Sequence, residues 1–355
     1  MIATREGRWV VAAIVTGSMG VFAIGCSKAE PPNPLADQSG PRVYVSNETE
    51  GSISVIDAAA NRLLATVPVG KRPRGIRATR DGRLVYVALS GSPIAGPGVD
   101  ESKLPPPDRS SDGIGIVDAG TGKLLRILKS GTDPEQFVLS ADETRLFVAN
   151  EDAGTLSVVD VSNGSILMTI EVGEEPEGVD LSPDGRFVYV TSEGHNQVAV
   201  IDAASFALVA IEEVGPRPRS TAFLPDGTRA YVSAENDASV YVIDTATHKT
   251  ISRIELGDAG QRPMGLVAAP EGGAIYVTTG RGRQLHRIST PGDTVTARVD
   301  VGDRPWGVAI STDGRTLYTA NGPSNDVSVI DAATMTVTAR VTVGERPWGV
   351  AYSGR

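Results

Sequence analysis

The sequence predicts an all-β fold, a seven-bladed β-propeller with four short antiparallel strands in each blade. Three markers recur along the chain, most often about 42 residues apart, and four strands within such a repeat are typical of propeller blades. The first marker is a glycine that ends a strand, at Gly70, Gly131, Gly173, Gly215, Gly257, Gly302 and Gly344. The second is an aspartate that follows an aliphatic strand, at Asp57, Asp118, Asp160, Asp202, Asp244 and Asp331. The third is an Asp-Gly pair, which favours a tight turn between antiparallel strands, at Asp81-Gly82, Asp184-Gly185, Asp226-Gly227 and Asp313-Gly314.

The strands expected within one copy follow each other closely. In the fourth copy they cover residues 178–181, 187–191, 197–201 and 205–214. No run has the apolar period of 3.6 residues that repeats built from helices need. The sixth copy is degenerate, with Ser289 at the position of the aspartate marker.

The two ends of the repeat region complement each other. Residues 42–47 begin with the second strand of a copy, and residues 348–353 supply a first strand. We therefore expect the C-terminal strand to pair with the N-terminal blade, which closes residues 41–355 into a ring and removes exposed sheet edges at the seam.

Residues 1–25 are expected to be a lipoprotein-type signal peptide. Two arginines precede an apolar run that is short for a bilayer span. The ending Ala23-Ile24-Gly25-Cys26 resembles a bacterial lipobox, which implies a lipidated Cys26, and Ser27 by the same resemblance favours the outer membrane. Residues 26–40 are polar and proline-rich, which predicts a flexible tether. The expected location is the periplasmic face of the outer membrane; the alternative is a soluble periplasmic or secreted protein with an unmodified Cys26.

Composition argues against several kinds of site. The formal net charge of −10 disfavours the broad attraction that non-specific nucleic-acid binding needs. Cys26 is the only cysteine, so an internal disulfide or a thiolate metal cluster is excluded. The three histidines are scattered, and no nucleophile has a recognisable motif. We therefore expect no metal, no cofactor and no catalytic residue.

The loop from the fourth strand of one blade to the first strand of the next is expected to open onto the mouth of the central channel. In most copies it has a Gly-x-x-Pro-x-Gly-like pattern, which defines two rings of residues. The ring before the proline consists of Arg72, Asp133, Glu175, Arg217, Arg262, Arg304 and Arg346. The ring after the proline consists of Arg74, Glu135, Glu177, Arg219, Met264, Trp306 and Trp348.

Two interpretations of these rings stay open. In the first, the mouth binds a ligand or partner, because arginines suit carboxylates and phosphates and two tryptophans on adjacent blades suit a ring or sugar face. The candidate residues are Arg72, Arg74, Glu135, Glu177, Arg217, Arg219, Arg262, Arg304, Trp306, Arg346 and Trp348. In the second, acids and arginines neutralise each other and the tryptophans pack on neighbouring prolines.

Two further stretches are expected on the same face. The loops between second and third strands are acidic and predict a solvated rim, with Glu48, Glu50, Glu151, Asp152, Glu193, Glu235, Asp237 and Asp326. The second blade carries an insertion at about residues 92–112, which contains the run Pro105-Pro106-Pro107. Long insertions in compact folds are usually functional or disordered, and a proline run can dock a partner in an extended form.

Several phrases in the repeats carry a resemblance to a known family. Val43-Tyr44-Val45-Ser46-Asn47, Phe187-Val188-Tyr189-Val190-Thr191 and Ile275-Tyr276-Val277-Thr278, together with Ser52-Ile53-Ser54-Val55-Ile56-Asp57, resemble the bacterial YVTN-repeat β-propeller family over residues 41–355. Lys71-Arg72-Pro73-Arg74-Gly75, Asp133-Pro134-Glu135, Glu175-Pro176-Glu177-Gly178 and residues 321–329 resemble the branch associated with pyrroloquinoline-quinone-dependent alcohol catabolism. That resemblance implies a periplasmic propeller that accompanies a quinoprotein dehydrogenase without binding the quinone.

Three functions are compatible with these observations. The first is a non-catalytic scaffold, expected to be a monomer, that binds a periplasmic protein or a small acidic metabolite. The second is a lactonase- or lyase-like enzyme at the mouth, which would hold a metal with Asp133, Glu135, Glu175 and Glu177. The third is a single-stranded nucleic-acid binder, against which the net charge counts.

Overall fold

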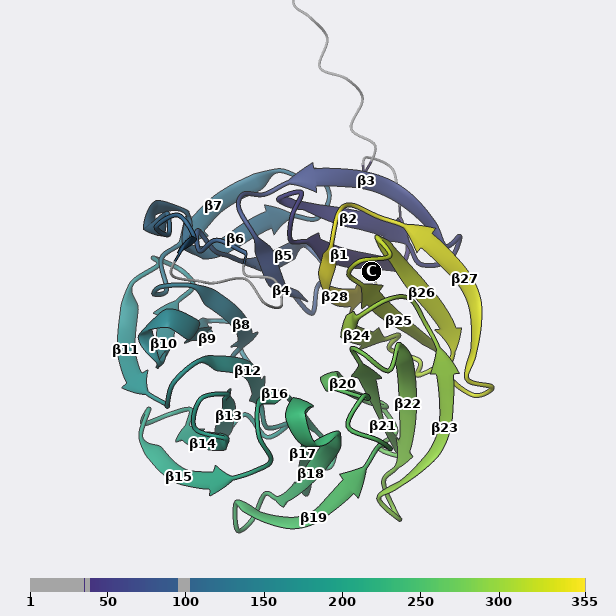
Figure 1. The fold of residues 1–355 in the computed structure, drawn as a ribbon. Helices are drawn as coiled ribbons and strands as arrows, with labels where there is room; N and C mark the ends of the chain where they lie inside the picture. The colour runs from purple at the N-terminus through teal and green to yellow at the C-terminus, as the bar shows by residue number, and fades with distance from the viewer. Residues whose placement is uncertain (1–34, 36–38, 95–102, 355) are drawn as a thin grey trace, which may run out of the picture. The chain divides into compact units, whose positions relative to one another are not determined.

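Seven four-stranded antiparallel sheets surround a central axis in the computed structural model, which describes residue 35 and residues 39–94 and 103–354 (Figure 1). In each sheet one strand lies beside the axis and the last lies at the rim. The predicted all-β, seven-bladed propeller with four antiparallel strands in each blade is therefore confirmed.

The strands are given from the axis outwards. Blade one contains β28 (Pro347–Ser353), β1 (Arg42–Asn47), β2 (Ser52–Asp57) and β3 (Arg62–Pro68). Blade two contains β4 (Pro73–Ala78), β5 (Leu84–Leu89), β6 (Gly113–Asp118) and β7 (Leu124–Leu128). Blade three contains β8 (Pro134–Leu139), β9 (Arg145–Asn150), β10 (Thr155–Asp160) and β11 (Ile166–Glu171). Blade four contains β12 (Pro176–Leu181), β13 (Phe187–Ser192), β14 (Gln197–Asp202) and β15 (Leu208–Glu213). Blade five contains β16 (Pro218–Phe223), β17 (Arg229–Ala234), β18 (Ser239–Asp244) and β19 (Lys249–Glu255). Blade six contains β20 (Pro263–Ala268), β21 (Ala274–Thr279), β22 (Gln284–Ser289) and β23 (Thr294–Asp300). Blade seven contains β24 (Pro305–Ile310), β25 (Thr316–Asn321), β26 (Asp326–Asp331) and β27 (Thr336–Thr342). Short 3-10 helices follow second strands at η2 (Arg109–Ser111), η3 (Glu151–Ala153) and η4 (Glu235–Asp237).

The ring closes through its two ends, as predicted. β28 pairs antiparallel with β1, in a register that runs from Arg42 opposite Ser353 to Asn47 opposite Pro347. Blade one is therefore built from both ends of the repeat region, and the seam is held by a ladder of backbone hydrogen bonds.

The aspartate markers cap the turn between the third and fourth strands. Asp202 is an example, because its Oδ1 accepts the backbone N–H groups of Ala204 and Ser205 at 3.0 and 2.8 Å. This turn places the start of β15 at Leu208, so the prediction of a strand from residue 205 was three residues too early. The Asp-Gly pairs join the first and second strands, and Gly185 has the positive φ of 74° that such a turn favours.

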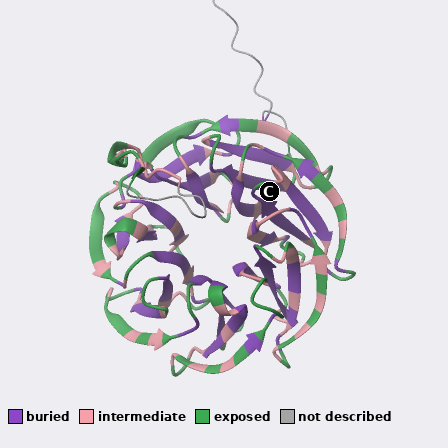
Figure 2. Cartoon of the chain, viewed as in Figure 1, coloured by how far each residue is buried: buried purple, intermediate pink, exposed green. Residues whose placement is uncertain are grey.

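The apolar core lies between neighbouring blades. The second and third strands are buried, whereas the outer strands are largely exposed (Figure 2). Each of the seven contacts between adjacent blades contains its own cluster of buried aliphatic and aromatic side chains. Since each cluster needs two blades, no single blade could bury its apolar faces alone.

Hydroxyl groups of the second strands join adjacent blades. The Oγ1 of Thr278 accepts the N–H of Gly265 in its own blade at 3.0 Å and donates to the carbonyl of Trp306 in the next blade at 2.8 Å. Ser46 does the same between Gly349 and Arg74, at 2.9 and 2.5 Å. The Ser or Thr of the repeated phrase thus fixes one blade against the next.

Close approach of the inner strands explains why a glycine occupies the second position after the proline in most blades. A Cβ on any of five of these glycines would lie only 2.5 to 2.8 Å from a carbonyl oxygen of the next blade, which is too close for any side chain. The five are Gly75, Gly178, Gly265, Gly307 and Gly349.

Part of the expected tether belongs to the propeller. Leu35 is buried among Tyr44, Ile53, Val67 and other core residues between blades one and two. The prediction of a tether over the whole of residues 26–40 is therefore wrong at Leu35. The expected signal peptide and Cys26 lie outside the described residues, among which no helix is both long and apolar enough to cross a membrane.

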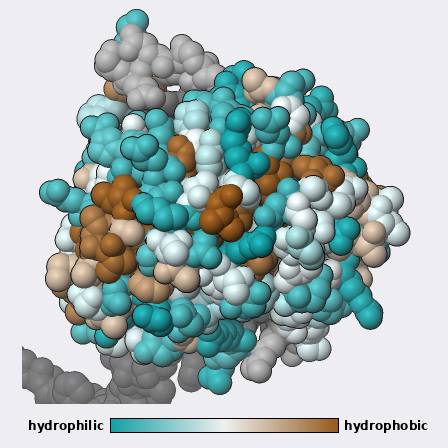
Figure 3. Space-filling model, turned by 90° about the horizontal axis from the view of Figure 1, so that it is seen from below, coloured by the Kyte–Doolittle hydropathy of each residue, from teal (hydrophilic) through white to brown (hydrophobic). Residues whose placement is uncertain are grey.

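One side of the rim is unusually apolar. The outer strands β7, β11 and β15 expose large aliphatic side chains, and Figure 3 shows apolar side chains gathered over one side of the wall of the ring. The exposed residues on these three strands are Leu124, Leu125, Ile127, Ile166, Leu167, Met168, Leu208, Val209 and Ile211.

Candidate functional site

The residue before the proline has a left-handed backbone in all seven blades, with φ between 42° and 60°. These residues are Arg72, Asp133, Glu175, Arg217, Arg262, Arg304 and Arg346. In six blades the carbonyl group of this residue accepts a hydrogen bond from the loop between the second and third strands, as Arg346 does from the N–H of Glu48 at 3.0 Å. Both classes of loop therefore lie on one face of the ring, as predicted, and surround the mouth. Left-handed backbone is costly for a residue with a side chain, so this turn is held by its surroundings.

The first ionic group at the mouth, called the Arg74 cluster, consists of Arg74, Asp133, Glu135 and Glu151. The guanidinium of Arg74 contacts Asp133 and Glu135, and its Nη1 lies 3.2 Å from Oε2 of Glu151. Burial opposes ionisation of Asp133, but Arg74 and Arg72 lower its pKa to about 2. Burial raises the pKa of Glu151 to about 7, although Arg74 attracts its ionised form.

The second ionic group, called the Arg219 cluster, consists of Arg219, Glu177, Glu193 and Glu235. Arg219 contacts Glu177 and Glu193, and its Nε lies 3.0 Å from Oε2 of Glu235. Arg217 adds ion pairs of 2.6 Å to Glu193 and 3.4 Å to Glu235. These contacts fit the second interpretation, in which acids and arginines of the two rings neutralise each other.

Glu48 joins two further arginines of the ring. Its carboxylate lies 2.9 Å from Nε of Arg72 and 3.1 Å from Nε of Arg346. Glu48, Glu193 and Glu235 are all buried, so the prediction of a fully solvated acidic rim is wrong for them. Ion pairing across the mouth removes these carboxylates from solvent.

The insertion of blade two lies beside the Arg74 cluster. Asp112 is buried, and it accepts the N–H of Gly91 at 2.7 Å and the N–H of Asp133 at 3.2 Å. Lys71 pairs with Asp108 at 2.7 Å. The described part of the insertion is thus attached to the mouth, and residues 95–102 lie outside the described residues.

The part of the mouth on blades seven and one is aromatic. Trp306 and Trp348 stack with their ring centroids 5.6 Å apart and their planes at 24°. The guanidinium carbon of Arg304 lies 4.8 Å from the Trp306 centroid, and that of Arg219 lies 5.1 Å from it. Arg262 contacts Asn236 at the edge of this region.

Arg304 differs from the other mouth arginines. Among the described residues no carboxylate lies within 4.0 Å of its guanidinium. Burial and the neighbouring Arg346 lower the pKa of Arg304, and the attraction of Glu235 and Glu48 does not offset them. The Trp306–Trp348 stack and Arg304 together form a surface with one positive charge and a flat apolar wall.

A cavity of about 320 Å³ extends along the channel from this surface. Its wall is made by the inner strands, and it includes Glu177, Arg219, Trp306 and Trp348 near the mouth. Met264, the remaining member of the second ring, is buried and also lines it.

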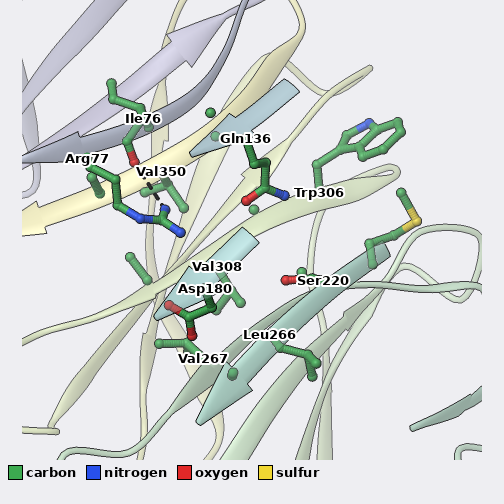
Figure 4. A pocket seen from close by; sticks show the side chains of 18 of the residues that line it. Ile76, Arg77, Gln136, Asp180, Ser220, Leu266, Val267, Trp306, Val308 and Val350 are labelled. Atoms are coloured by element: carbon green, nitrogen blue, oxygen red, sulfur yellow. Dashed lines mark hydrogen bonds between the residues drawn. The ribbon is translucent and has the colours of Figure 1, made fainter. Parts of the chain in front are cut away.

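Deeper in the cavity lie three polar side chains that the sequence analysis missed. Arg77 on β4, Gln136 on β8 and Asp180 on β12 come from three consecutive blades (Figure 4). Arg77 and Asp180 could have been found from the repeat, because each is the fourth residue after the proline of its blade. The other five blades have valine or alanine at that position. Burial lowers the pKa of Arg77 and raises the pKa of Asp180 to about 6, although each attracts the charge of the other.

Comparison with known proteins identifies both a family and a fold. The model of the choice-of-anchor I domain family matches residues 36–215, which is half of the chain. No curated protein matches the chain. Hydrazine synthase from Kuenenia stuttgartiensis is 22% identical, with a TM-score of 0.71 over 88% of this chain and 99% of that chain. A candidate 6-phosphogluconolactonase from Bacteroides fragilis is 18% identical, with a TM-score of 0.71 over 89% and 98%. A functionally unknown protein from Desulfotomaculum acetoxidans is 15% identical, with a TM-score of 0.72 over 88% and 98%. At these identities the structures share the fold with this chain.

Proposed function

The chain belongs to the choice-of-anchor I domain family, and we propose that it is a non-catalytic binding protein of the cell envelope that takes a small carboxylate-bearing molecule at its channel mouth. The single observation that carries this proposal is the contrast between Arg304 and the other mouth arginines. Arg72, Arg74, Arg219 and their neighbours are neutralised by carboxylates, whereas Arg304 lies over Trp306 with no carboxylate of the described residues beside it.

The chemistry of this surface suits a planar or apolar acid. A guanidinium offers two parallel N–H donors to a carboxylate, and the pair is strong where water is partly excluded. The stacked rings of Trp306 and Trp348 supply an apolar wall beside that charge. The cavity of about 320 Å³ lies near the lower end of small-molecule pockets, which is roughly 300–1,000 Å³.

The enzyme alternative has weaker support in the geometry. Asp133, Glu135 and Glu177 are engaged by arginines, and Glu175 is exposed. Within the described residues no group of three or more acids, histidines or cysteines is placed to hold a metal ion. The likeness to a candidate lactonase suggests a sugar lactone as the substrate with which to test this alternative. If the wild type hydrolysed the lactone and the Glu135→Gln and Glu177→Gln variants did not, the enzyme alternative would replace the binding proposal.

The proposed location rests on the sequence of the N-terminus. We infer that Cys26 is lipidated and that the propeller is held at the outer membrane, with the accessory role in quinoprotein alcohol oxidation as a further prediction from the YVTN resemblance. A Cys26→Ser variant is expected to move from the membrane fraction to the soluble fraction. Retention of the variant in the membrane would contradict the lipid anchor.

Tryptophan fluorescence tests the binding proposal directly, because Trp306 and Trp348 line the cavity. Benzoate, a flat ring with one carboxylate, is expected to change this fluorescence in a saturable way. Arg304→Gln should weaken benzoate at least tenfold, about 1.4 kcal/mol, by removing its charge partner. Arg83→Gln is the matched control, because Arg83 lies in a turn between first and second strands and is exposed. Equal affinity of Arg304→Gln and wild type, or no saturable change, would overturn the proposal.

A further inference from the structure

The geometry points to a zwitterion as the ligand: we propose that the channel holds the head of an apolar α-amino acid, with its carboxylate on Arg77 and its ammonium on Asp180. This inference rests on the proposed function, since the same cavity opens at the mouth beside Trp306 and Trp348. It adds a second subsite deeper in that cavity than Arg304, with the class of ligand that this subsite would recognise.

Two opposite charges face one cavity without forming a close ion pair. Arg77 and Asp180 both line the channel and are only half-buried, and no ion pair of 4.0 Å or less joins them. Figure 4 shows the guanidinium and the carboxylate directed into the same space. Arg77 donates to the carbonyl of Ile76 at 3.2 Å, and Asp180 accepts the N–H of Leu181 at 3.0 Å and a backbone hydrogen bond from Phe223. These contacts are local backbone ones and do not pair the two charges.

The position of this pair is unusual within the fold. Five blades place Val138, Ala222, Val267, Ala309 and Ala351 at the corresponding position of the inner strand. An isolated charge is costly in such surroundings unless a partner of opposite charge reaches it. A ligand with one anionic and one cationic group satisfies both side chains at once, and its zero net charge matches the balanced wall.

The remaining wall supplies contacts for the rest of an amino acid. Gln136, on the blade between those of Arg77 and Asp180, can donate and accept hydrogen bonds beside the head group. Val308, Val350 and Leu266 make the nearby wall apolar, and Trp306 stands toward the mouth (Figure 4). A side chain that points from the head group to the mouth would therefore contact aliphatic and aromatic groups.

Charge balance also argues against a metal ion here. Among the described residues that line the cavity, the carboxylates are Asp180 and, near the mouth, Glu177, which pairs with Arg219; the neighbouring Arg77 repels a cation. The remaining alternative is that water molecules bridge the two side chains and the pair has no ligand.

Calorimetric titration with three related probes tests the inference. L-phenylalanine carries both charges, N-acetyl-L-phenylalanine lacks the ammonium, and L-phenylalaninamide lacks the carboxylate. We expect L-phenylalanine to bind at least tenfold more tightly than either derivative. Asp180→Asn should weaken L-phenylalanine at least tenfold while leaving N-acetyl-L-phenylalanine unchanged, and Arg77→Gln should weaken both.

A matched control separates charge at this site from charge in general. Asp202→Asn removes a carboxylate from an outer turn and should leave all three affinities unchanged. Melting temperatures measured beside the titrations establish that each variant is folded.

The outcomes distinguish this inference from the proposed function. If N-acetyl-L-phenylalanine binds as tightly as L-phenylalanine and Asp180→Asn changes neither affinity, the inference of a zwitterionic ligand is overturned. Carboxylate binding at the mouth would still stand in that case. If none of the three probes nor benzoate binds, the proposed function itself fails, and the bridging-water alternative is favoured.

Discussion

Replacing Asp180 by asparagine is expected to stabilise the propeller, although the same change should remove the ammonium site. The pKa of Asp180 is raised by burial to about 6 from an ordinary value of 3.8, with Arg77 acting in the opposite direction. A carboxyl with a raised pKa costs stability once the unfolded chain ionises, and the cost is full above the folded pKa. One pKa unit corresponds to about 1.4 kcal/mol, so the shift amounts to about 3 kcal/mol at pH 7.5.

The sign of the pH dependence follows from the same shift. As the pH falls below 6, the folded wild-type protein takes up the proton on Asp180 and the cost disappears progressively. The advantage of Asp180→Asn should therefore shrink to about 1.5 kcal/mol at pH 5 and vanish below the unfolded pKa. Asparagine keeps the shape of the side chain and can still accept the N–H of Leu181.

Thermal unfolding at pH 7.5 and pH 5 measures the effect. For a propeller of this length, 3 kcal/mol corresponds to a rise of about 4 °C in Tm. The Asp202→Asn control, which removes a capping carboxylate whose pKa is lowered by hydrogen bonds from Ser205, should not raise Tm at all. A lower Tm for Asp180→Asn at pH 7.5, or a gain of equal size at pH 5, would refute the assignment of Asp180 as a costly charge.

Three further predictions concern the framework. Thr278→Val should lower the free energy of unfolding by about 2 kcal/mol because it removes the hydrogen bond to Gly265 within blade six and the one to Trp306 in blade seven. Thr66→Val on an exposed outer strand should change Tm by less than a degree or so, and equal Tm values for the two variants would contradict the role of the hydroxyl. Arg74→Met should lower the free energy of unfolding by about 3–5 kcal/mol, because it leaves buried carboxylates without their cation. Chemical unfolding measures this loss beside that of the exposed Arg83→Met variant, and equal losses would show that the Arg74 cluster contributes little to stability. Burial lowers the pKa of His286 to about 4, so the imidazole takes up its proton in the unfolded chain at a higher pH than in the folded protein. Between pH 7.5 and pH 5 the free energy of unfolding of the wild type should therefore fall by about 2 kcal/mol relative to that of His286→Gln. Parallel pH profiles of these two proteins would contradict that prediction.

The functional residues divide by how they could be recognised. The two rings at the mouth could be predicted from the Pro-x-Gly pattern, because a repeated turn places equivalent residues at equivalent heights. Which arginines of the rings are paired with carboxylates could not be predicted, because pairing depends on the distances between blades. Arg219 contacts acids of blades four and five and also faces Trp306, 87 positions later in the sequence.

The sequence by itself determined the architecture: seven copies of one unit, closed by the pairing of β28 with β1. This was possible because the Asp-Gly turns, the capping aspartates and the Ser or Thr hydroxyls act within one blade or between neighbours, and the chain repeats them. Only the tertiary structure decided which arginine is left without a carboxylate beside it and that Arg77 and Asp180 share one cavity. Closure of the ring sets those distances, and electrostatic interactions depend on distance and burial rather than on position in the chain.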